Sequence, residues 1–316
     1  MRVVAFGGGH GLGASLRALR GLDVDITAVV TVGDDGGSSG RLRAERNALL
    51  PPGDLRQALA ALAEDDAFSQ QTAQLLQYRF APARSGPDGL AGHAVGNLLL
   101  LGLMELLGDP IAALDHARTM VRARGRVLPM AEHAVGIEAD VLGGDPARPG
   151  DVVTIRGQHA VAVTTGHVES VRLTPPSPPV CPAVLEVIAD ADWLIFGPGS
   201  WYTSVLPHLL VPSLAAAIVA SPARRLITVN LAADNETLGM SVADHLAELS
   251  RYLPSLRVDA VLADDKWVGD PVPVHTAAGA LGARLVLAPL AVADGSPRHD
   301  PESLGVALVP VLGADR

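Results

Sequence analysis

Cysteine is nearly absent from this 316-residue sequence, in which Cys181 is the only one. A single cysteine excludes an internal disulfide and a cysteine-rich zinc site, and it is typical of proteins that work in a reducing compartment. The N-terminal residues begin directly with a strand pattern over residues 2–6 and show no charged-then-apolar leader. We therefore expect a cytoplasmic protein.

Aromatic residues, basic residues and long apolar runs are also scarce. Aromatics make up 3% of the chain, so a core drawn from its 48% hydrophobic residues must be built mainly from Ala, Val, Leu and Ile. The 24 basic residues are outnumbered by 34 acidic ones, and the net charge of -10 disfavours nucleic acid as a partner. The longest apolar stretch, residues 98–104, ends at Glu105 and is far shorter than the ~18 residues that a membrane span requires. We expect no nucleic-acid partner and no membrane span.

Short apolar strands alternate with amphipathic helices along most of the chain. This predicts a Rossmann-like α/β fold, with a parallel sheet and helices on both of its faces. Residues 137–175 break the alternation with short β segments, including Val161 and Val163, and predict a small β insertion. We expect one domain over residues 1–316, with a mobile connection over 267–282. The expected strands cover residues 3–6, 26–32, 193–196, 226–230, 258–262 and 284–287. The expected helices cover residues 11–20, 55–62, 93–107, 214–220, 242–252 and 302–309, of which 93–107 is apolar enough to be buried.

A glycine-rich loop follows the first expected strand. Residues 7–14 read Gly-Gly-Gly-His-Gly-Leu-Gly-Ala, and the spacing Gly9-x-Gly11-x-x-Ala14 matches a dinucleotide-binding pattern. Glycines let the backbone approach a phosphate, and the following helix points its free N–H groups and the positive end of its dipole at that phosphate. The placement favours a phosphate or nucleotide site over a tight turn without a ligand. His10 either donates to a phosphate or caps the helix.

A second polar loop ends the next expected strand. Asp34 and Asp35 are followed by four small residues, which include Ser38 and Ser39, and then by Arg41 after a glycine. The carboxyl ends of parallel strands meet at one edge of a sheet, so we expect this loop beside the glycine loop. The paired carboxylates would orient a ligand hydroxyl or hold Mg²⁺, and the alternative is a solvated turn.

Two expected helix starts carry polar residues whose roles the sequence leaves open. Asp54 follows a Pro-Pro-Gly segment and is placed either to cap a helix or to face the crevice. His93 and Asn97 are four residues apart and share a helical face, where they need partners from the core or from a ligand. We favour the ligand.

A second glycine turn follows the third expected strand and, like the first, lies between a strand and the start of a helix. Gly199 is followed by the hydroxyls of Ser200, Thr203 and Ser204, where a helix begins. Two such turns at one edge of a sheet can cradle a diphosphate from both sides.

Polar residues also follow the next expected strand. Asn230 ends that strand and residues 234–237 precede a helix, so both fall at crevice positions, with helix capping as the alternative for Thr237. Asp244 and His245 could mimic a catalytic dyad. Adjacent residues point about 100° apart on a helix, which favours a structural role for this pair.

Taken in order, these segments resemble the gluconeogenesis factor (YvcK-like) family. The motifs are GGGHGL, TVGDDGGSSGRLR, PPGDLR, GHAVGNL, GPGSWYTS, and NET followed by DHL, and they match from residue 3 to about residue 253. The part from about 254 to 316 matches weakly. His10 stands where many members have threonine.

The resemblance implies a Rossmann-like fold shared with 2-phospho-L-lactate transferase and the binding of UDP-sugars such as UDP-N-acetylglucosamine. It also implies a role in cell shape and wall synthesis during growth on gluconeogenic carbon, and it implies no particular reaction. It places the ligand contacts on Gly8 to Leu12, Asp34, Asp35, Asn97, Gly199 to Ser204, Asn230 and Arg298, and the residues singled out above add Ser38, Ser39 and Asp54 to the candidate set.

Two departures from the family pattern bear on the ligand. Asp234 and Asn235 replace the usual Pro-Gly, and Met240 stands where we expect an aromatic residue to pack on the base; methionine also packs there. Two other functions stay open. One is a transferase of a phosphate-linked group, like the lactate transferase relatives, and the other is an NAD-dependent oxidoreductase, for which the second-strand loop gives no support. We favour a binding or regulatory protein, and the oligomeric state stays open, with a homo-oligomer included.

Overall fold

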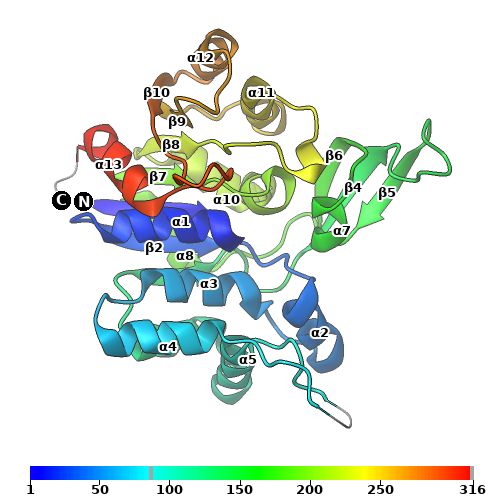
Figure 1. Cartoon of the computed structure of the whole chain (residues 1–316), viewed down its shortest axis with the longest axis vertical. Helices are drawn as coiled ribbons and strands as arrows, with labels where there is room; N and C mark the ends of the chain where they lie inside the picture. The colour runs from blue at the N-terminus through cyan, green and yellow to red at the C-terminus, as the bar shows by residue number, and fades with distance from the viewer. Residues whose placement is uncertain (85–87, 314–316) are drawn as a thin grey trace.

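The computed structural model of the protein describes residues 1–84 and 88–313. Its main element is a seven-stranded parallel sheet with the strand order β10-β9-β8-β7-β1-β2-β3 (Figure 1). The predicted parallel α/β sheet is confirmed. Its strands are β1 (Arg2–Gly7), β2 (Asp25–Val30), β3 (Arg126–Pro129), β7 (Trp193–Phe196), β8 (Arg224–Thr228), β9 (Ala260–Asp264) and β10 (Arg284–Ala288).

Helices surround this sheet. Helices α1 and α13 lie together over one face, and α8 packs on the opposite face against β1 and β3 (Figure 1). The helices are α1 (Gly9–Arg20), α2 (Gly37–Arg46), α3 (Pro52–Leu62), α4 (Ala67–Gln77), α5 (Val95–Leu107), α6 (Pro110–Met120), α7 (Gln158–Ala162), α8 (Pro182–Asp190), α9 (Pro207–Leu210), α10 (Pro212–Ala220), α11 (Val242–Tyr252), α12 (Pro271–Ala280) and α13 (Pro301–Leu312), with a π-helical turn η1 (Trp201–Val205) and a 3-10 turn η2 (Asn235–Thr237). None of the helices in the described part of the chain has both the length and the apolarity of a membrane span.

The order of the strands creates a crevice at the middle of the sheet. Because helices cover both faces, every residue of β7 and of β9 is buried. The chain adds β2 and β3 on one side of β1 and β7 to β10 on the other, so the winding reverses between β1 and β7. Ligands of open parallel sheets bind at such a reversal, outside the carboxyl ends of the strands.

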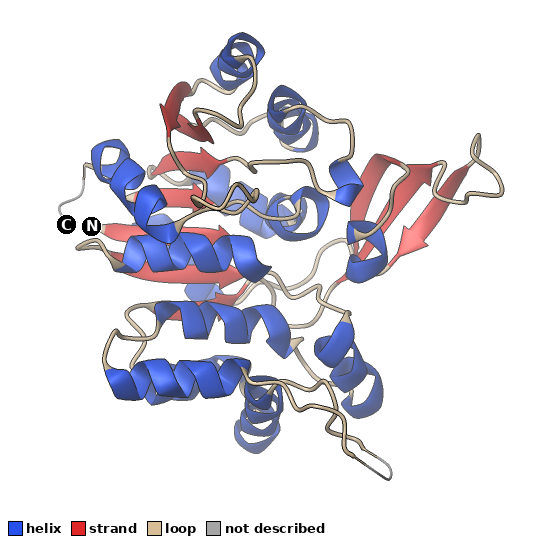
Figure 2. Ribbon diagram, in the orientation of Figure 1, coloured by secondary structure: helices blue, strands red, loops and turns tan. Residues whose placement is uncertain are grey.

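A three-stranded antiparallel sheet stands beside the main sheet (Figure 2). It consists of β4 (Gly136–Leu142), β5 (Val152–Arg156) and β6 (His167–Thr174), in the order β5-β4-β6, and forms the predicted β insertion. Glu138 joins its strands through ion pairs with Arg156 (3.1 Å) and Arg172 (3.0 Å). The β segment expected around Val161 and Val163 is wrong. These residues belong to the short helix α7 and its end, where Val161 is fully buried and Val163 is half exposed.

Three other local expectations were wrong. Residues 267–282 contain helix α12, whose apolar residues are spread around its circumference and therefore show no helical period. The segment after Asp35 is helix α2 and not an open loop, although its glycines and serines disfavour a helix. Helix α5 buries one face only, and Leu106 on its outer face is 79% exposed, because α5 lies at the edge of the α3–α4–α5 layer (Figure 1).

Candidate ligand-binding site

A cavity of about 880 Å³ opens at the reversal between β1 and β7. The turn after β1 forms one wall through residues 8–11, and the turn after β7 forms another through residues 198–200. The remaining walls come from the loop after β8, which includes Asn230, and from the segment that leads into α13, which includes Arg298. This volume lies in the range of cavities that hold small-molecule ligands and cofactors.

The glycines of the first turn are required by close contacts. A Cβ on Gly8 would lie 2.5 Å from Asp54 Oδ2, and Gly9 has a φ of +58°, which glycine adopts most readily. A Cβ on Gly11 would overlap the carbonyl oxygen of Pro198. The two glycine turns therefore touch each other beside the cavity.

His10 lies in the first turn of α1 and is not its cap. The helix begins at Gly9, two residues earlier than predicted, and Gly8 takes the N-cap position. His10 is exposed and lines the cavity. The first turn of a helix leaves its N–H groups without intrahelical partners, so this end of α1 offers donors and a positive dipole to an anion. Leu12 is 1% exposed and belongs to the core instead of the cavity wall.

Asn230 fixes the second glycine turn. Its side-chain amide accepts a hydrogen bond from Gly199 N and donates one to Gly199 O, both at 2.8 Å. Ser200 and Ser204 line the cavity beside this clamp. Thr203 is 1% exposed and bonds to the hydroxyl of Ser200. The structure thus brings Gly199, Ser200, Ser204 and Asn230 to one cavity, with Thr203 behind them.

Glu236 is a residue of this site that the sequence reasoning did not single out. Its side chain is 2% exposed, and Oε1 accepts from Ser200 Oγ at 2.6 Å and from Tyr202 N at 2.9 Å. Burial raises the pKa of Glu236 to about 7, although the hydrogen bonds from Ser200 and Tyr202 lower it. The available signal was the segment of residues 234–237, which was expected at the crevice, although no role was assigned to Glu236 itself.

Asp54 occupies the corresponding place behind the first turn. It is 9% exposed, and it accepts from Thr31 Oγ1 at 3.1 Å and from the backbone N–H of Gly9. Burial, followed by the charge of Asp34, raises the pKa of Asp54 to about 7. It does not cap α3, because Pro51 holds the N-cap position.

The two carboxylates of the second-strand loop point to different partners. Asp35 accepts from the backbone N–H groups of Gln158 (3.1 Å) and His159 (2.8 Å) at the start of α7. Asp34 accepts from Gly36 N at 3.0 Å. Each oxygen of Asp35 accepts one of these N–H groups, which directs Asp35 to α7, while Asp34 is directed to Gly36. Within residues 1–84 and 88–313, no group of three or more His, Cys, Asp or Glu side chains is placed to hold a metal ion.

Ser38, Ser39 and Asn97 lie in a buried polar network and do not line the cavity. Ser38 Oγ is 2.9 Å from His93 Nδ1 and accepts from Asn97 Nδ2 at 3.0 Å. Ser39 Oγ accepts from Gly53 N at 3.0 Å. These bonds fasten α2 to α5 and α3. This is the core hydrogen-bonding role that the sequence left open for Asn97.

Basic side chains line another part of the cavity. Arg17, Arg298 and His299 lie there. Burial lowers the pKa of Arg17, and it lowers the pKa of His299 to about 4, so the imidazole of His299 is neutral near pH 7. Arg298 donates to Asp294 Oδ2 at 2.7 Å and to Ser296 Oγ at 2.9 Å. A guanidinium is well suited to phosphate. Arg298 comes from the far end of the sequence, which is why only the resemblance indicated it.

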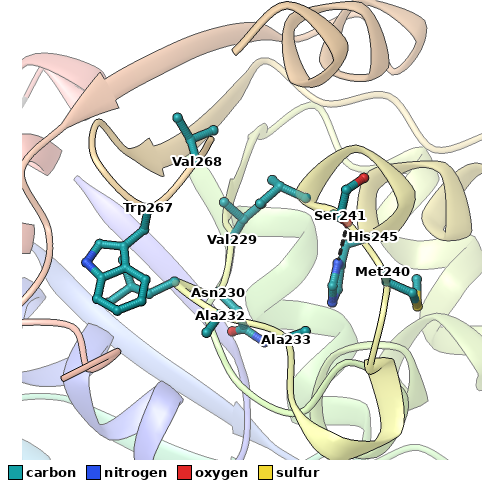
Figure 3. Close-up of a pocket in the computed structure, with 11 residues that line it drawn as sticks. Val229, Asn230, Ala232, Ala233, Met240, Ser241, His245, Trp267 and Val268 are labelled. Carbon is teal, nitrogen blue, oxygen red and sulfur yellow. Dashed lines mark hydrogen bonds between the residues drawn. The ribbon is translucent and has the colours of Figure 1, made fainter. Parts of the chain in front are cut away.

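A smaller chamber of about 230 Å³ lies beside the loop after β8 (Figure 3). Residues 230–233 line both spaces. Trp267 and His245 stand on opposite sides of the chamber, and Met240 lies near His245 (Figure 3). His245 Nδ1 bonds to the carbonyl oxygen of Ser241 at 2.7 Å, which ties its ring to the start of α11.

Gly11→Ala is expected to destabilise the protein by about 1–3 kcal/mol, because the added methyl group overlaps the Pro198 carbonyl and forces the turns apart. Gly13→Ala is the matched control in the same helix. Its new Cβ would lie 3.5 Å from the nearest atom, on Arg17, and alanine favours a helix over glycine by up to about 1 kcal/mol. Urea unfolding compares the variants, and equal stabilities would contradict the contact between the turns.

A parallel α/β sheet with two glycine turns at its reversal point defines a protein of the Rossmann-like class. Residues 3–278 match the family described as 2-phospho-L-lactate transferase CofD. A Mycobacterium tuberculosis relative that carries the gluconeogenesis factor name is 47% identical over 317 residues, which covers 99% of this chain and 91% of that protein. The gluconeogenesis factor of Bacillus subtilis is 36% identical over 272 residues, 86% of this chain and 81% of that protein.

A crystal structure provides the same match in three dimensions. A Bacillus halodurans protein of the UPF0052 family superposes with a TM-score of 0.83 at 34% identity, covering 98% of both chains. The chain belongs to the gluconeogenesis factor family, which shares the CofD fold. The resemblance found in the sequence is confirmed.

Proposed function

We propose that the protein binds a nucleotide diphosphate sugar, with UDP-N-acetylglucosamine as the first choice, and that it acts as a cytoplasmic binding protein. The observation that carries this proposal is the pair of glycine turns, residues 8–11 and 198–200, on the walls of one cavity. Each turn follows a central strand of the sheet. At this position, backbone N–H groups and the positive end of a helix dipole can bind a diphosphate.

The cavity and the chamber together suit the parts of such a ligand. The diphosphate lies between the two turns, within reach of Arg298. The base enters the smaller chamber beside Met240 and Trp267, since thioether and indole surfaces pack well on a flat ring (Figure 3). The sugar then occupies the rest of the larger cavity.

The family implies the physiological setting of this binding. We propose that the bound nucleotide sugar connects the protein to cell shape and wall synthesis during growth on gluconeogenic carbon. A bound wall precursor would report the supply of building blocks, which is a role for a binding protein and needs no reaction.

A transferase of a phosphate-linked group is the second candidate, favoured by the match of residues 3–278 to the CofD family. Its proton-accepting group would have to be found near the first turn, where Asp34 and Asp54 lie close enough to influence each other. Neither carboxyl is among the described residues that line the cavity, so we favour the binding protein. Turnover of a phosphate-linked donor with a deazaflavin acceptor would establish the transferase instead.

UDP-N-acetylglucosamine is expected to raise the melting temperature, whereas NAD and a deazaflavin are not. A ligand at about 100 times its Kd adds ~2.7 kcal/mol to the free energy of unfolding, which corresponds to a rise in melting temperature of roughly 4 °C for a chain of this size. Thermal unfolding with millimolar ligands measures the shift. A flat melting temperature with every nucleotide sugar would refute the proposal.

Gly199→Val is the variant that should lose this shift. The φ of +145° at Gly199 disfavours a β-branched residue at the edge of the cavity. Gly108→Val is the matched control, because Gly108 also has a positive φ, +66°, but lies at the end of α5. We expect Gly108→Val to have a lower melting temperature than the wild type but to show the same ligand-induced rise in melting temperature.

A further inference from the structure

Each glycine turn of the cavity has a buried carboxyl behind it. Asp54 stands behind the turn after β1, and Glu236 stands behind the turn after β7. They are 9% and 2% exposed, and neither forms a salt bridge within the described part of the chain. Two acidic groups at a site built for an anion require a physical explanation.

The surroundings of Asp54 favour its neutral form. Burial is the largest influence on its pKa, and the neighbouring Asp34 raises it further. The hydrogen bonds from Thr31 and from Gly9 N, together with the charge of Arg56, act in the opposite direction and leave the pKa at about 7. The pKa of Asp54 therefore lies near neutral pH, and its hydrogen bond from Gly9 N couples its charge to the first glycine turn.

The surroundings of Glu236 have the same effect. Its Oε1 holds Ser200 Oγ and Tyr202 N, but its Oε2 is buried without a hydrogen-bond partner among the described residues. An ionised oxygen without a partner is costly in the interior. The nearby Asp234 and burial both raise the pKa of Glu236, and no cation is among the causes that lower it.

We propose, on the basis of the diphosphate binding proposed above, that Asp54 and Glu236 are proton-binding positioning residues, each of which takes up a proton as the anionic ligand settles on its turn. Negative charge on the cavity side of a turn disfavours a second negative charge behind it. The protons come from solvent and stay on the carboxyl oxygens. Affinity for the ligand therefore falls as pH rises above about 7, by up to about tenfold per pH unit for each carboxyl.

Calorimetric titration with UDP-N-acetylglucosamine tests the coupling. Titrations from about pH 6 to about pH 9, each in buffers of different ionisation enthalpy, give the number of protons taken up. The diphosphate of this probe is a diester and does not titrate in the range. His299 also lines the cavity and could gain a proton beside an anion, so variants must separate the sources.

Glu236→Gln and Asp54→Asn keep an oxygen acceptor and cannot titrate. Near pH 8 we expect the wild type to take up on the order of one proton per carboxyl, and each variant to lose one of them and to show a flatter pH dependence of Kd. Asp115→Asn is the control, because Asp115 pairs with Arg126 at 2.7 Å on α6 and β3 and does not line the cavity. It should keep the wild-type slope.

The possible outcomes separate this inference from the proposed function. Binding with no proton uptake by the wild type, or uptake that both variants retain in full, would overturn the inference and leave nucleotide-sugar binding in place. Absence of binding at every pH would overturn both. The first of these outcomes is decided by the wild type alone and does not depend on whether a variant folds.

Discussion

Glu236→Gln is expected to make the ligand-free protein more stable than the wild type at alkaline pH, by about 3 kcal/mol. Burial raises the pKa of Glu236 from 4.5 to about 7, so the folded state holds a proton that the unfolded state releases between these values. The free energy of unfolding of the wild type therefore falls as pH rises through this window and levels off above it. Glutamine does not titrate and keeps the oxygen that accepts from Ser200 and Tyr202, so the variant lacks this fall.

Urea unfolding at about pH 5 and about pH 8.5 measures the difference. The free energies of unfolding of the wild type and Glu236→Gln should be similar at the lower pH, and that of the variant should be clearly larger at the higher pH. Asp54→Asn is expected to behave in the same way, because burial and the charge of Asp34 raise the pKa of Asp54 from 3.8 to about 7. If the free energy of unfolding changed equally with pH in Glu236→Gln and in the wild type, the pKa of Glu236 would be the same in the folded and unfolded states, which would contradict this prediction.

Asp35→Ala is expected to lower the free energy of unfolding by about 3 kcal/mol and to loosen the β insertion. Its carboxylate accepts the backbone N–H groups of Gln158 and His159, which join the end of β2 to the start of α7. Hydrogen bonds to a charged group contribute about 1.5–3 kcal/mol each, and partial exposure reduces their sum. Because α7 contacts η1 and η2, the loosening should reach the second glycine turn and weaken ligand binding.

Urea unfolding and limited proteolysis of the insertion measure these effects. Asp145→Ala is the matched control, since Asp145 lies in the same insertion and bonds to Ala147 N and Arg148 at an exposed turn, where we expect a loss below about 1 kcal/mol. A chelator should not change the stability or the ligand affinity of the wild type, because the proposed site holds the diphosphate with backbone N–H groups and Arg298 and uses no metal ion. If a chelator lowered the stability or the ligand affinity, the result would support a magnesium ion shared by Asp34 and Asp35.

The residues predicted best are those that follow the central strands. Gly9, Gly11, Gly199 and Asn230 each lie just after a strand, and all parallel strands deliver their carboxyl ends to the same edge of the sheet. Their meeting at one cavity therefore follows from local pattern alone. The same pattern could not decide the partner of Asn97, because a polar residue on an apolar helix has the same sequence signal whether its partner is a ligand or a serine.

The sequence could not assign different roles to adjacent residues in one loop. Asp34 and Asp35 are equivalent by composition, yet one lies beside Asp54 and the other accepts from α7, about 120 residues further along the chain. Glu236 was hidden for a related reason. Its short turn reads as a cap, and its buried bonds to Ser200 exist only because the loops after β7 and β8 pack against each other.

By itself, the sequence determined the alternation of strands and helices, the two glycine turns and the family, because each of these depends on neighbouring residues and their order. Only the tertiary structure decided which polar side chains reach the cavity, which ones fasten helices together, and which carboxyls are buried. Packing between distant elements sets those positions, as it does for Arg298 in the cavity wall and Asp35 at α7. Burial then sets the pKa of Asp54 and Glu236, which no pattern of neighbouring residues contains.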